Sequence, residues 1–245
     1  MPARATFDVA GRGVSTAFSE RADGDFAIGG AAAAIASATG PLTAARSALA
    51  PHPWTWLEQV HGAGVVVVAR PGQWAGARCD ASVTAVPGAV LAVQTADCAP
   101  ILLWGDGPGP SAGPVIGAVH AGWRGLYDGV IEAAVGAMRD LGARDVRAAL
   151  GPCISAAAYE FGERELTTMA LRFGPDVVAA TEDGAPALDV AAAVRVALTT
   201  VGVDLDDAAV ACTATALDAD GAPRFFSHRA RGDSGRQASA VWIEP

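Results

Sequence analysis

The sequence predicts a single α+β domain, a mixed α/β fold in which helices flank a mixed β-sheet. Short β-branched or alternating segments recur along the chain, and segments with helical spacing of apolar residues fall between them. No internal repeat and no linker-like stretch divides the sequence, so one domain is expected over residues 1–245. With 51% hydrophobic and 18% charged residues, the chain has ample material for a buried core.

The first half of the chain is mostly extended. Glycine-rich turns such as Gly62-Ala63-Gly64 separate its short apolar runs, and the Gly- and Pro-rich stretch at 106–114 is a loop by composition. Alanine-rich stretches predict the helices of this half. In chain order, strands are expected at 13–18, 54–61, 65–69, 80–84, 89–94 and 101–104, with helices at 31–36 and 41–49.

The second half contains the longer helices. In the segment 128–138, apolar residues recur at the spacing of one helix face, at Val130, Ile131, Ala134, Val135 and Met138. Further helices are expected at 163–173 and 190–201. Strands are expected at 146–150 and 208–213, and the tail returns as extended segments at 225–227 and 238–243.

Charge and cysteine usage bound the partners and the compartment. The net charge of −9 argues against nonspecific binding to nucleic acid or to an anionic membrane, but leaves room for a small anion held by arginines. The N-terminus lacks the apolar core of a signal peptide, and no apolar stretch is long enough to span a bilayer. The four cysteines form no Cys-x-x-Cys pair and are expected to be reduced thiols, so we expect a cytoplasmic protein.

Two segments place soft metal ligands at strand ends. Cys98 follows the apolar run 89–93, and His120 follows the run 114–117. With His61 upstream they form a set of two imidazoles and one thiolate, which suits zinc or copper. Three protein ligands leave the fourth tetrahedral position open, as in a catalytic zinc site. The alternative is that each histidine is an ordinary polar side chain.

The segments around these ligands resemble the YfiH family, also called the laccase-domain or polyphenol-oxidase-like family. The resemblance runs from about Val14 to Ile243 and rests on Gln59-Val60-His61, Thr95-Ala96-Asp97-Cys98-Ala99-Pro100, Val119-His120-Ala121-Gly122-Trp123-Arg124-Gly125, Gly151-Pro152-Cys153-Ile154, Tyr159-Glu160-Phe161 and Phe226-Ser227-His228-Arg229. One departure is Ala158, where members often carry a further cysteine.

The resemblance implies a function as well as a fold. It implies a zinc ion held by Cys98, His120 and His61. It also implies purine nucleoside phosphorylase activity, with adenosine deaminase and methylthioadenosine phosphorylase activities alongside. A purine nucleoside and phosphate are then the expected small-molecule partners. Some bacterial members are linked instead to peptidoglycan editing.

Five other residues are candidates for the site, each with a plainer alternative. Asp80 is a general acid/base or orients a metal-binding histidine, or it caps a turn. Cys153 presents a thiolate beside the metal, or is a small buried residue. Arg124 can bind phosphate as a fork, and Arg229 and Arg236 can do the same from a C-terminal loop, although loop arginines are usually solvated.

Rival functions make different demands on these residues. A multicopper oxidase needs a further copper cluster, and only His52 and His228 remain to build one. An amidase acting on peptidoglycan precursors would use Cys153 or the metal. A non-catalytic binding protein would carry the metal for structure alone, which the open fourth position argues against. Zinc is therefore expected rather than copper.

Overall fold

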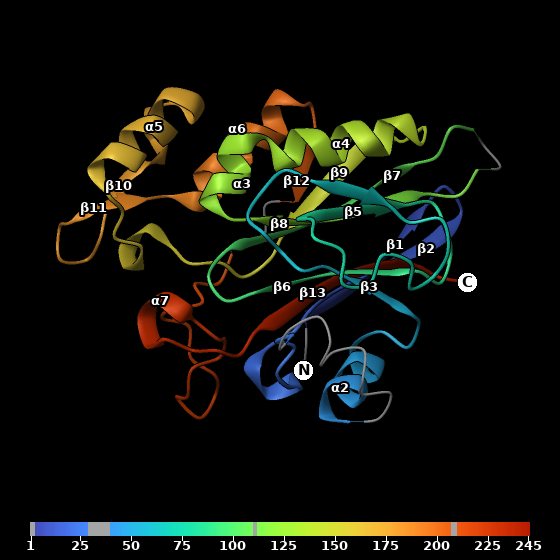
Figure 1. Ribbon diagram of the computed structural model, residues 1–245, viewed down its shortest axis with the longest axis horizontal. Coiled ribbons are helices and arrows are strands. Elements are labelled where there is room, and N and C mark those ends of the chain that lie inside the picture. The colour runs from blue at the N-terminus through green and yellow to red at the C-terminus, as the bar shows by residue number, and fades with distance from the viewer. Residues whose placement is uncertain (1–2, 29–39, 110–111, 207–209) are drawn as a thin grey trace.

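The architecture is two β-sheets packed face to face, with helices on the outside. The computed structural model describes residues 3–28, 40–109, 112–206 and 210–245. Figure 1 shows α3 (Trp123–Asp128), α4 (Val130–Asp140) and α6 (Val190–Thr200) covering one sheet, while α2 (Pro41–Leu49) lies beyond the other. The predicted class, a single mixed α/β domain, is confirmed, and all the described strands outside one short hairpin divide into two mixed sheets.

The smaller of these sheets joins the two ends of the chain. Its five strands lie in the order β1-β2-β13-β6-β3, and only the β3–β6 pair is parallel. The C-terminal strand β13 therefore lies between the second strand of the chain and β6. The bounds are Ala3–Val9, Arg12–Phe18, Gln237–Ile243, Val90–Thr95 and Trp54–Trp56.

The larger sheet has six strands in the order β12-β9-β7-β8-β5-β4. Its two edge pairs, β12–β9 and β4–β5, are parallel, and the central pairs are antiparallel. The bounds are Asp204–Asp206, Arg144–Leu150, Ala99–Asp106, Val115–Ala121, Ala81–Thr84 and Val65–Val67.

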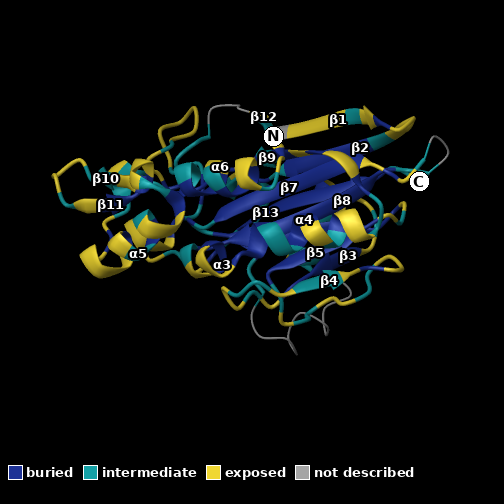
Figure 2. Ribbon diagram, turned by 90° about the horizontal axis from the view of Figure 1, so that it is seen from above, coloured by how far each residue is buried: buried dark blue, intermediate teal, exposed yellow. Residues whose placement is uncertain are grey.

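Strand β7 is buried on both faces, which explains its nearly continuous apolar sequence. Ile101 and Leu103 belong to the core beneath the helices, whereas Leu102 and Trp104 belong to the core between the sheets. A third cluster, built around Trp54, Trp56 and Leu49, packs α2 onto the outer face of the five-stranded sheet. Figure 2 shows the buried sheets and the exposed outer sides of the helices.

The remaining elements are one further long helix and several short segments. They are α5 (Glu163–Phe173), α7 (His228–Arg231), the 3₁₀ helices Arg21–Asp23, Ala156–Ala158 and Pro175–Val177, and the hairpin β10 (Val178–Ala180)–β11 (Pro186–Leu188). The helix predicted at 128–138 begins earlier, as two helices. Gly129, with φ of 88°, occupies the left-handed region and separates α3 from α4.

Three expectations differ from the structure, and one cannot be compared with it. The strand predicted at 54–61 ends as β3 at Trp56, and beyond it a single bridge joins Leu57 to Ala77. The strand predicted at 208–213 is wrong over 210–213, where a single bridge joins Cys212 to Cys153. The strand of this region is β12, whose half-buried Leu205 packs on the helical side. Residues 225–227 lead into α7 and form no strand. The helix predicted at 31–36 lies outside the described residues.

None of the helices in the described part of the chain is long and apolar enough to cross a membrane.

The core beneath the helices predicts a difference between two identical substitutions. Leu198 in α6 is fully buried, whereas Leu171 in α5 is 85% exposed. Leu198→Ala should lower the free energy of unfolding by about 2–5 kcal/mol because it leaves a cavity. Leu171→Ala should change it by less than about 0.5 kcal/mol. Chemical denaturation of both variants checks this, and equal losses would contradict the assigned packing.

Candidate functional site

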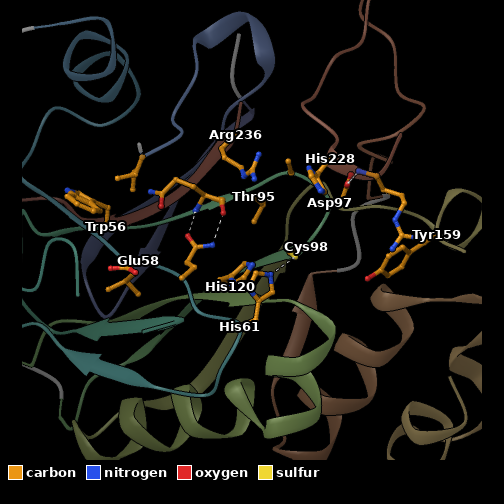
Figure 3. Close-up of a pocket in the computed structure, with 16 residues that line it drawn as sticks. Trp56, Glu58, His61, Thr95, Asp97, Cys98, His120, Tyr159, His228 and Arg236 are labelled. Atoms are coloured by element: carbon orange, nitrogen blue, oxygen red, sulfur yellow. Dashed lines mark hydrogen bonds between the residues drawn. The ribbon is translucent and has the colours of Figure 1, made fainter. Parts of the chain in front are cut away.

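Three side chains from separate parts of the sandwich converge at one end of it. His61 follows β3, Cys98 lies between β6 and β7, and His120 is near the end of β8. Their ligand atoms all lie within 4.8 Å of one another, with Cys98 Sγ 3.8 Å from His61 Nε2 (Figure 3). The structure therefore brings together the three predicted metal ligands.

Strand alternation explains why His120 faces this point. Ile116 and Ala118 belong to the core between the sheets, and His120 is the next residue on that face of β8. Its ring meets that of His61 edge-on, with the centroids 4.8 Å apart. His120 is buried, Cys98 is partly exposed and His61 is exposed, so the group is open to a ligand on one side.

The arrangement fits a tetrahedral metal ion. Zinc bound at about 2.0–2.3 Å from nitrogen and sulfur places neighbouring ligand atoms roughly 3.3–3.8 Å apart. The Cys98–His61 separation of 3.8 Å already meets this, and the widest separation of 4.8 Å requires only a small contraction. Two imidazoles and one thiolate suit zinc or copper. This is the one group of three or more metal-binding side chains found among the described residues.

Asp80 orients two of these ligands. Its fully buried carboxylate accepts hydrogen bonds from His120 Nδ1 at 2.8 Å and from the backbone N–H groups of His61 at 2.9 Å and Gly62 at 2.8 Å. Burial alone would raise the pKa of Asp80, but these hydrogen bonds and the charge of His120 hold it below its ordinary value. Because Nδ1 is engaged, Nε2 of His120 is left for the metal.

His61 has an unusual backbone conformation. Its φ of 60° lies in the left-handed region, which costs a non-glycine residue roughly 1–2 kcal/mol. The acceptors of Asp80 hold the backbone there, because they bind the N–H groups on both sides of the strained residue. The strain therefore serves to aim the imidazole at the other ligands.

Cys98 and His120 shift each other's titration. Burial alone raises the pKa of Cys98, but the charge of His120 and hydrogen bonds from both histidines lower it overall. Burial alone lowers the pKa of His120, but Cys98 and Asp80 raise it overall. The two pKa directions favour a thiolate beside an imidazolium, so a metal ion that binds Nε2 of His120 would have to displace its proton.

Two glycines permit the close approach of α3 to the ligands. A Cβ on Gly122 would lie 2.7 Å from His61 Cδ2 and 3.4 Å from Cys98 Sγ. A Cβ on Gly125 would lie 2.8 Å from the carbonyl oxygen of Gly62. The glycines that follow His120 in the sequence are therefore needed for packing around His61.

The ligands line a cavity of about 700 Å³. In Figure 3 they lie between Trp56 and Glu58 on one side and Tyr159 on the other. Arg229 and Arg236, the two arginines predicted to bind substrate, also line the cavity. The Arg229 guanidinium lies 4.8 Å from the centroid of the Tyr159 ring, and Arg236 Nη1 donates to three backbone carbonyls, of Asp233, Ser234 and Gly235.

Three predicted catalytic residues do not line the cavity among the residues described. Arg124 is exposed, with its guanidinium over the ring of Trp123 at 4.5 Å. Cys153 is buried in the core beneath the helices, and burial raises the pKa of its thiol to about 12. Asp80 lies behind His120 and His61, which favours its orienting role.

Sequence reasoning missed several residues of the cavity wall. Asp97, whose φ is 96°, accepts hydrogen bonds from the hydroxyls of Thr213 at 2.7 Å and Ser227 at 2.6 Å, and from the Arg229 backbone N–H at 2.6 Å. Its position beside Cys98 was the available signal. Tyr159 and His228 lie within quoted motifs, and Gln94 carried no signal at all.

Comparison with known proteins places the chain in a family. A family model described as "Multi-copper polyphenol oxidoreductase laccase" matches residues 4–244. The chain belongs to this family. Relatives of this chain include proteins named purine nucleoside phosphorylase. One from Streptomyces coelicolor is 42% identical over 195 residues, covering 77% of this chain and 74% of the relative. YfiH of Escherichia coli is 36% identical over 190 residues, covering 77% and 73%.

Solved structures of the family share the fold. A Neisseria meningitidis protein superposes with a TM-score of 0.76 at 28% identity, covering 100% of this chain and 99% of that one. YlmD from Geobacillus stearothermophilus superposes with a TM-score of 0.68 at 26% identity, covering 97% and 94%. The likeness spans the whole sandwich, which includes the ends of the strands that carry the ligands.

The tight packing around Gly122 predicts that Gly122→Ala weakens metal binding. The added methyl group displaces His61, so the metal affinity should fall by about 10-fold or more, as for other losses of ligand orientation. Gly136→Ala is the matched control, because a Cβ at this exposed position of α4 meets nothing within 4 Å. Competition titrations with a chromogenic chelator measure both affinities. Equal affinities would show that Gly122 does not constrain the site.

Removing the charge of Asp80 tests its orienting role. In Asp80→Asn an amide N–H₂ faces the backbone donors of residues 61 and 62, so His61 and His120 lose their common anchor. The metal affinity should fall by about 10–100-fold. Asp140→Asn, at the exposed end of α4, should leave it unchanged. If Asp80→Asn binds the metal as tightly as the unaltered protein, Asp80 does not orient the two histidines.

Proposed function

We propose that this protein is a zinc-dependent purine nucleoside phosphorylase. It converts adenosine, inosine or guanosine and phosphate into the free base and ribose 1-phosphate. The observation that carries the proposal is the His61–Cys98–His120 group in a cavity that also presents Arg229 and Arg236. The names of the relatives support the same activity.

The cavity is large enough for both reactants. Its volume of about 700 Å³ lies within the range of about 300–1,000 Å³ typical of small-molecule sites. Trp56, Leu57 and Ile28 supply an apolar wall for a base, whereas Arg229 and His228 supply polar groups near Tyr159. We place the base at the first wall and the phosphate at the second.

Arg229 is held ready to bind the phosphate. Its backbone N–H is fixed by Asp97, and its guanidinium lies over Tyr159 and donates to the carbonyl oxygen of Glu160. A pre-organised guanidinium loses little conformational freedom when it binds a phosphate oxygen. A phosphate oxygen forms the new bond to the ribose C1′ while the C1′–N9 bond breaks. The electron pair of the C1′–N9 bond leaves with the base, and the base takes up the proton that the phosphate loses.

His61, Cys98 and His120 would hold the metal ion beside this reaction. A bound zinc ion supplies a Lewis acid that stabilises negative charge on an oxygen. Asp80 fixes the tautomer of His120 by accepting from Nδ1, and it holds His61 in its strained conformation. Deamination of adenosine and phosphorolysis of methylthioadenosine would use the same cavity and are proposed only as side activities.

The rival functions find less support in the geometry. An amidase would lose its candidate nucleophile, because Cys153 is buried with a raised pKa and does not line the cavity among the residues described. A multicopper centre would need a second cluster of histidines. The two remaining histidines do not form one, because His52 lies 3.9 Å from Glu244 whereas His228 lines the cavity. Zinc at a single three-ligand site remains the better proposal.

The proposal predicts base release that depends on both phosphate and Cys98. Cys98→Ala should lower the rate of phosphate-dependent base release from inosine by at least about 100-fold, because a Lewis acid contributes several kcal/mol. Cys79→Ser, which alters a thiol outside the ligand group, should retain the activity. Product chromatography with and without phosphate measures both. Undiminished turnover in Cys98→Ala, or base release that ignores phosphate, would overturn the proposal.

A further inference from the structure

We propose that the side-chain amide of Gln94 recognises the six-membered-ring edge of the base, which selects purine nucleosides with a 6-oxo or 6-amino group. The inference rests on the proposed function. Gln94 lines the cavity near the end of β6, and only 7% of its surface is exposed. Neither Nε2 nor Oε1 of its amide has a hydrogen-bond partner within the described part of the chain.

The other three glutamines show that an amide without hydrogen-bond partners is exceptional in this protein. Gln59 pairs with the backbone of residue 94 through both amide atoms, at 2.7 and 2.8 Å. Gln237 pairs in the same way with the backbone of Phe226, and Gln73 Oε1 accepts from the Ala69 N–H. A buried amide without partners costs stability, so the fold gains nothing from an amide at position 94. A ligand that supplies both a donor and an acceptor would explain it.

A second unpartnered group lies beside the first. Thr95 is 2% exposed and lines the same cavity, and its Oγ1 has no partner among the described residues. Successive residues of a strand point to opposite faces, so the cavity wraps around the end of β6. Two neighbouring residues at this end of β6 therefore carry buried polar groups without partners and line the cavity, and the pairing of Gln59 keeps the strand end in place.

The surroundings of Gln94 suit a flat heterocycle. Val90 and Ala92 occupy the same face of β6 as Gln94 and pack with Trp56 in the outer cluster. Trp56 is paired in register with Ala92, so the indole lies beside the strand position that precedes Gln94 on that face. An aromatic wall with an unpaired amide beside it provides a stacking surface and hydrogen-bonding groups for a base.

The chemistry of an amide defines the substrates. Oε1 accepts from N1–H of a 6-oxopurine while Nε2 donates to O6. After a rotation of the amide by half a turn, Oε1 accepts from the 6-amino group and Nε2 donates to N1. Both classes make two hydrogen bonds. A purine without a group at C6 makes only one and leaves half of the amide unpaired, so it should be a poor substrate.

The test compares inosine with purine riboside, the nucleoside that lacks a C6 substituent. We expect the kcat/KM ratio of inosine to purine riboside to fall by about 10-fold or more in Gln94→Met. Inosine and purine riboside also differ in the intrinsic reactivity of their leaving groups. This difference cancels when the ratio for Gln94→Met is compared with the ratio for the unaltered protein. An unchanged ratio would overturn the inference.

Thermal stability separates recognition from a structural role. Because Gln94→Met removes an unpaired amide and keeps the side-chain volume, its Tm should be equal to or higher than that of the unaltered protein. Gln237→Met removes a paired amide and should lower the Tm. A lower Tm in Gln94→Met would mean that the amide serves the fold and would contradict the inference.

A binding measurement distinguishes failure of the inference from failure of the proposed function. If no nucleoside releases base with phosphate, the proposed phosphorolysis is wrong. Recognition by Gln94 is then measured with the free bases hypoxanthine and purine as probes. A Tm rise with hypoxanthine that exceeds the rise with purine, and that disappears in Gln94→Met, would keep the recognition. Equal shifts in both proteins would overturn it as well.

Discussion

The arrangement of the site depends on the buried carboxylate of Asp80. It accepts hydrogen bonds from the backbone at residues 61 and 62 and from the ring of His120, so one side chain joins the segment after β3 to the end of β8. The backbone of Asp80 adds to this, since its carbonyl accepts from the His120 N–H at 2.7 Å. Two candidate ligands that are 59 positions apart in the sequence are thereby placed by one residue, which directly precedes β5.

A second buried carboxylate does the same for the opposite wall. Asp97 precedes Cys98 and binds the hydroxyls of Thr213 and Ser227 together with the backbone of Arg229. The C-terminal segment therefore lies against the thiol ligand. Because charged hydrogen bonds of buried groups are expensive to leave unmade, both carboxylates restrain the loops around the cavity. The chemistry of the site is thus built on loops that rigid strand ends hold in place.

Much of the fold followed from local patterns in the sequence. Helices α5 and α6 show a strong apolar spacing, and their expected bounds agree with the structure to within one residue. The long apolar run of β7 identified a strand but could not say that its two faces contact different layers. Short edge strands such as β10, β11 and β12 have three residues each, which is too few for alternation to show.

The candidate site was likewise predictable from the sequence only in part. Histidine and cysteine at strand ends, with the family resemblance, predicted the three side chains that the structure brings together, because ligand chemistry is visible in residue type. The cavity wall was less predictable, since it is made by tertiary contacts between distant segments. Cys153 and Arg124 belong to motifs of the family resemblance, yet the fold buries Cys153 beneath the helices and places the guanidinium of Arg124 over Trp123. Gln94 became informative only once its missing partners could be seen.

The central claim is that one metal ion at the Asp80-organised site supports phosphorolysis. The most direct measurement is a titration of metal-free protein with zinc while the phosphate-dependent release of hypoxanthine from inosine is followed. The account predicts that activity rises in proportion to added zinc and reaches its maximum at one ion per chain. Full activity without metal, or a rise that continues well beyond one ion per chain, would contradict it.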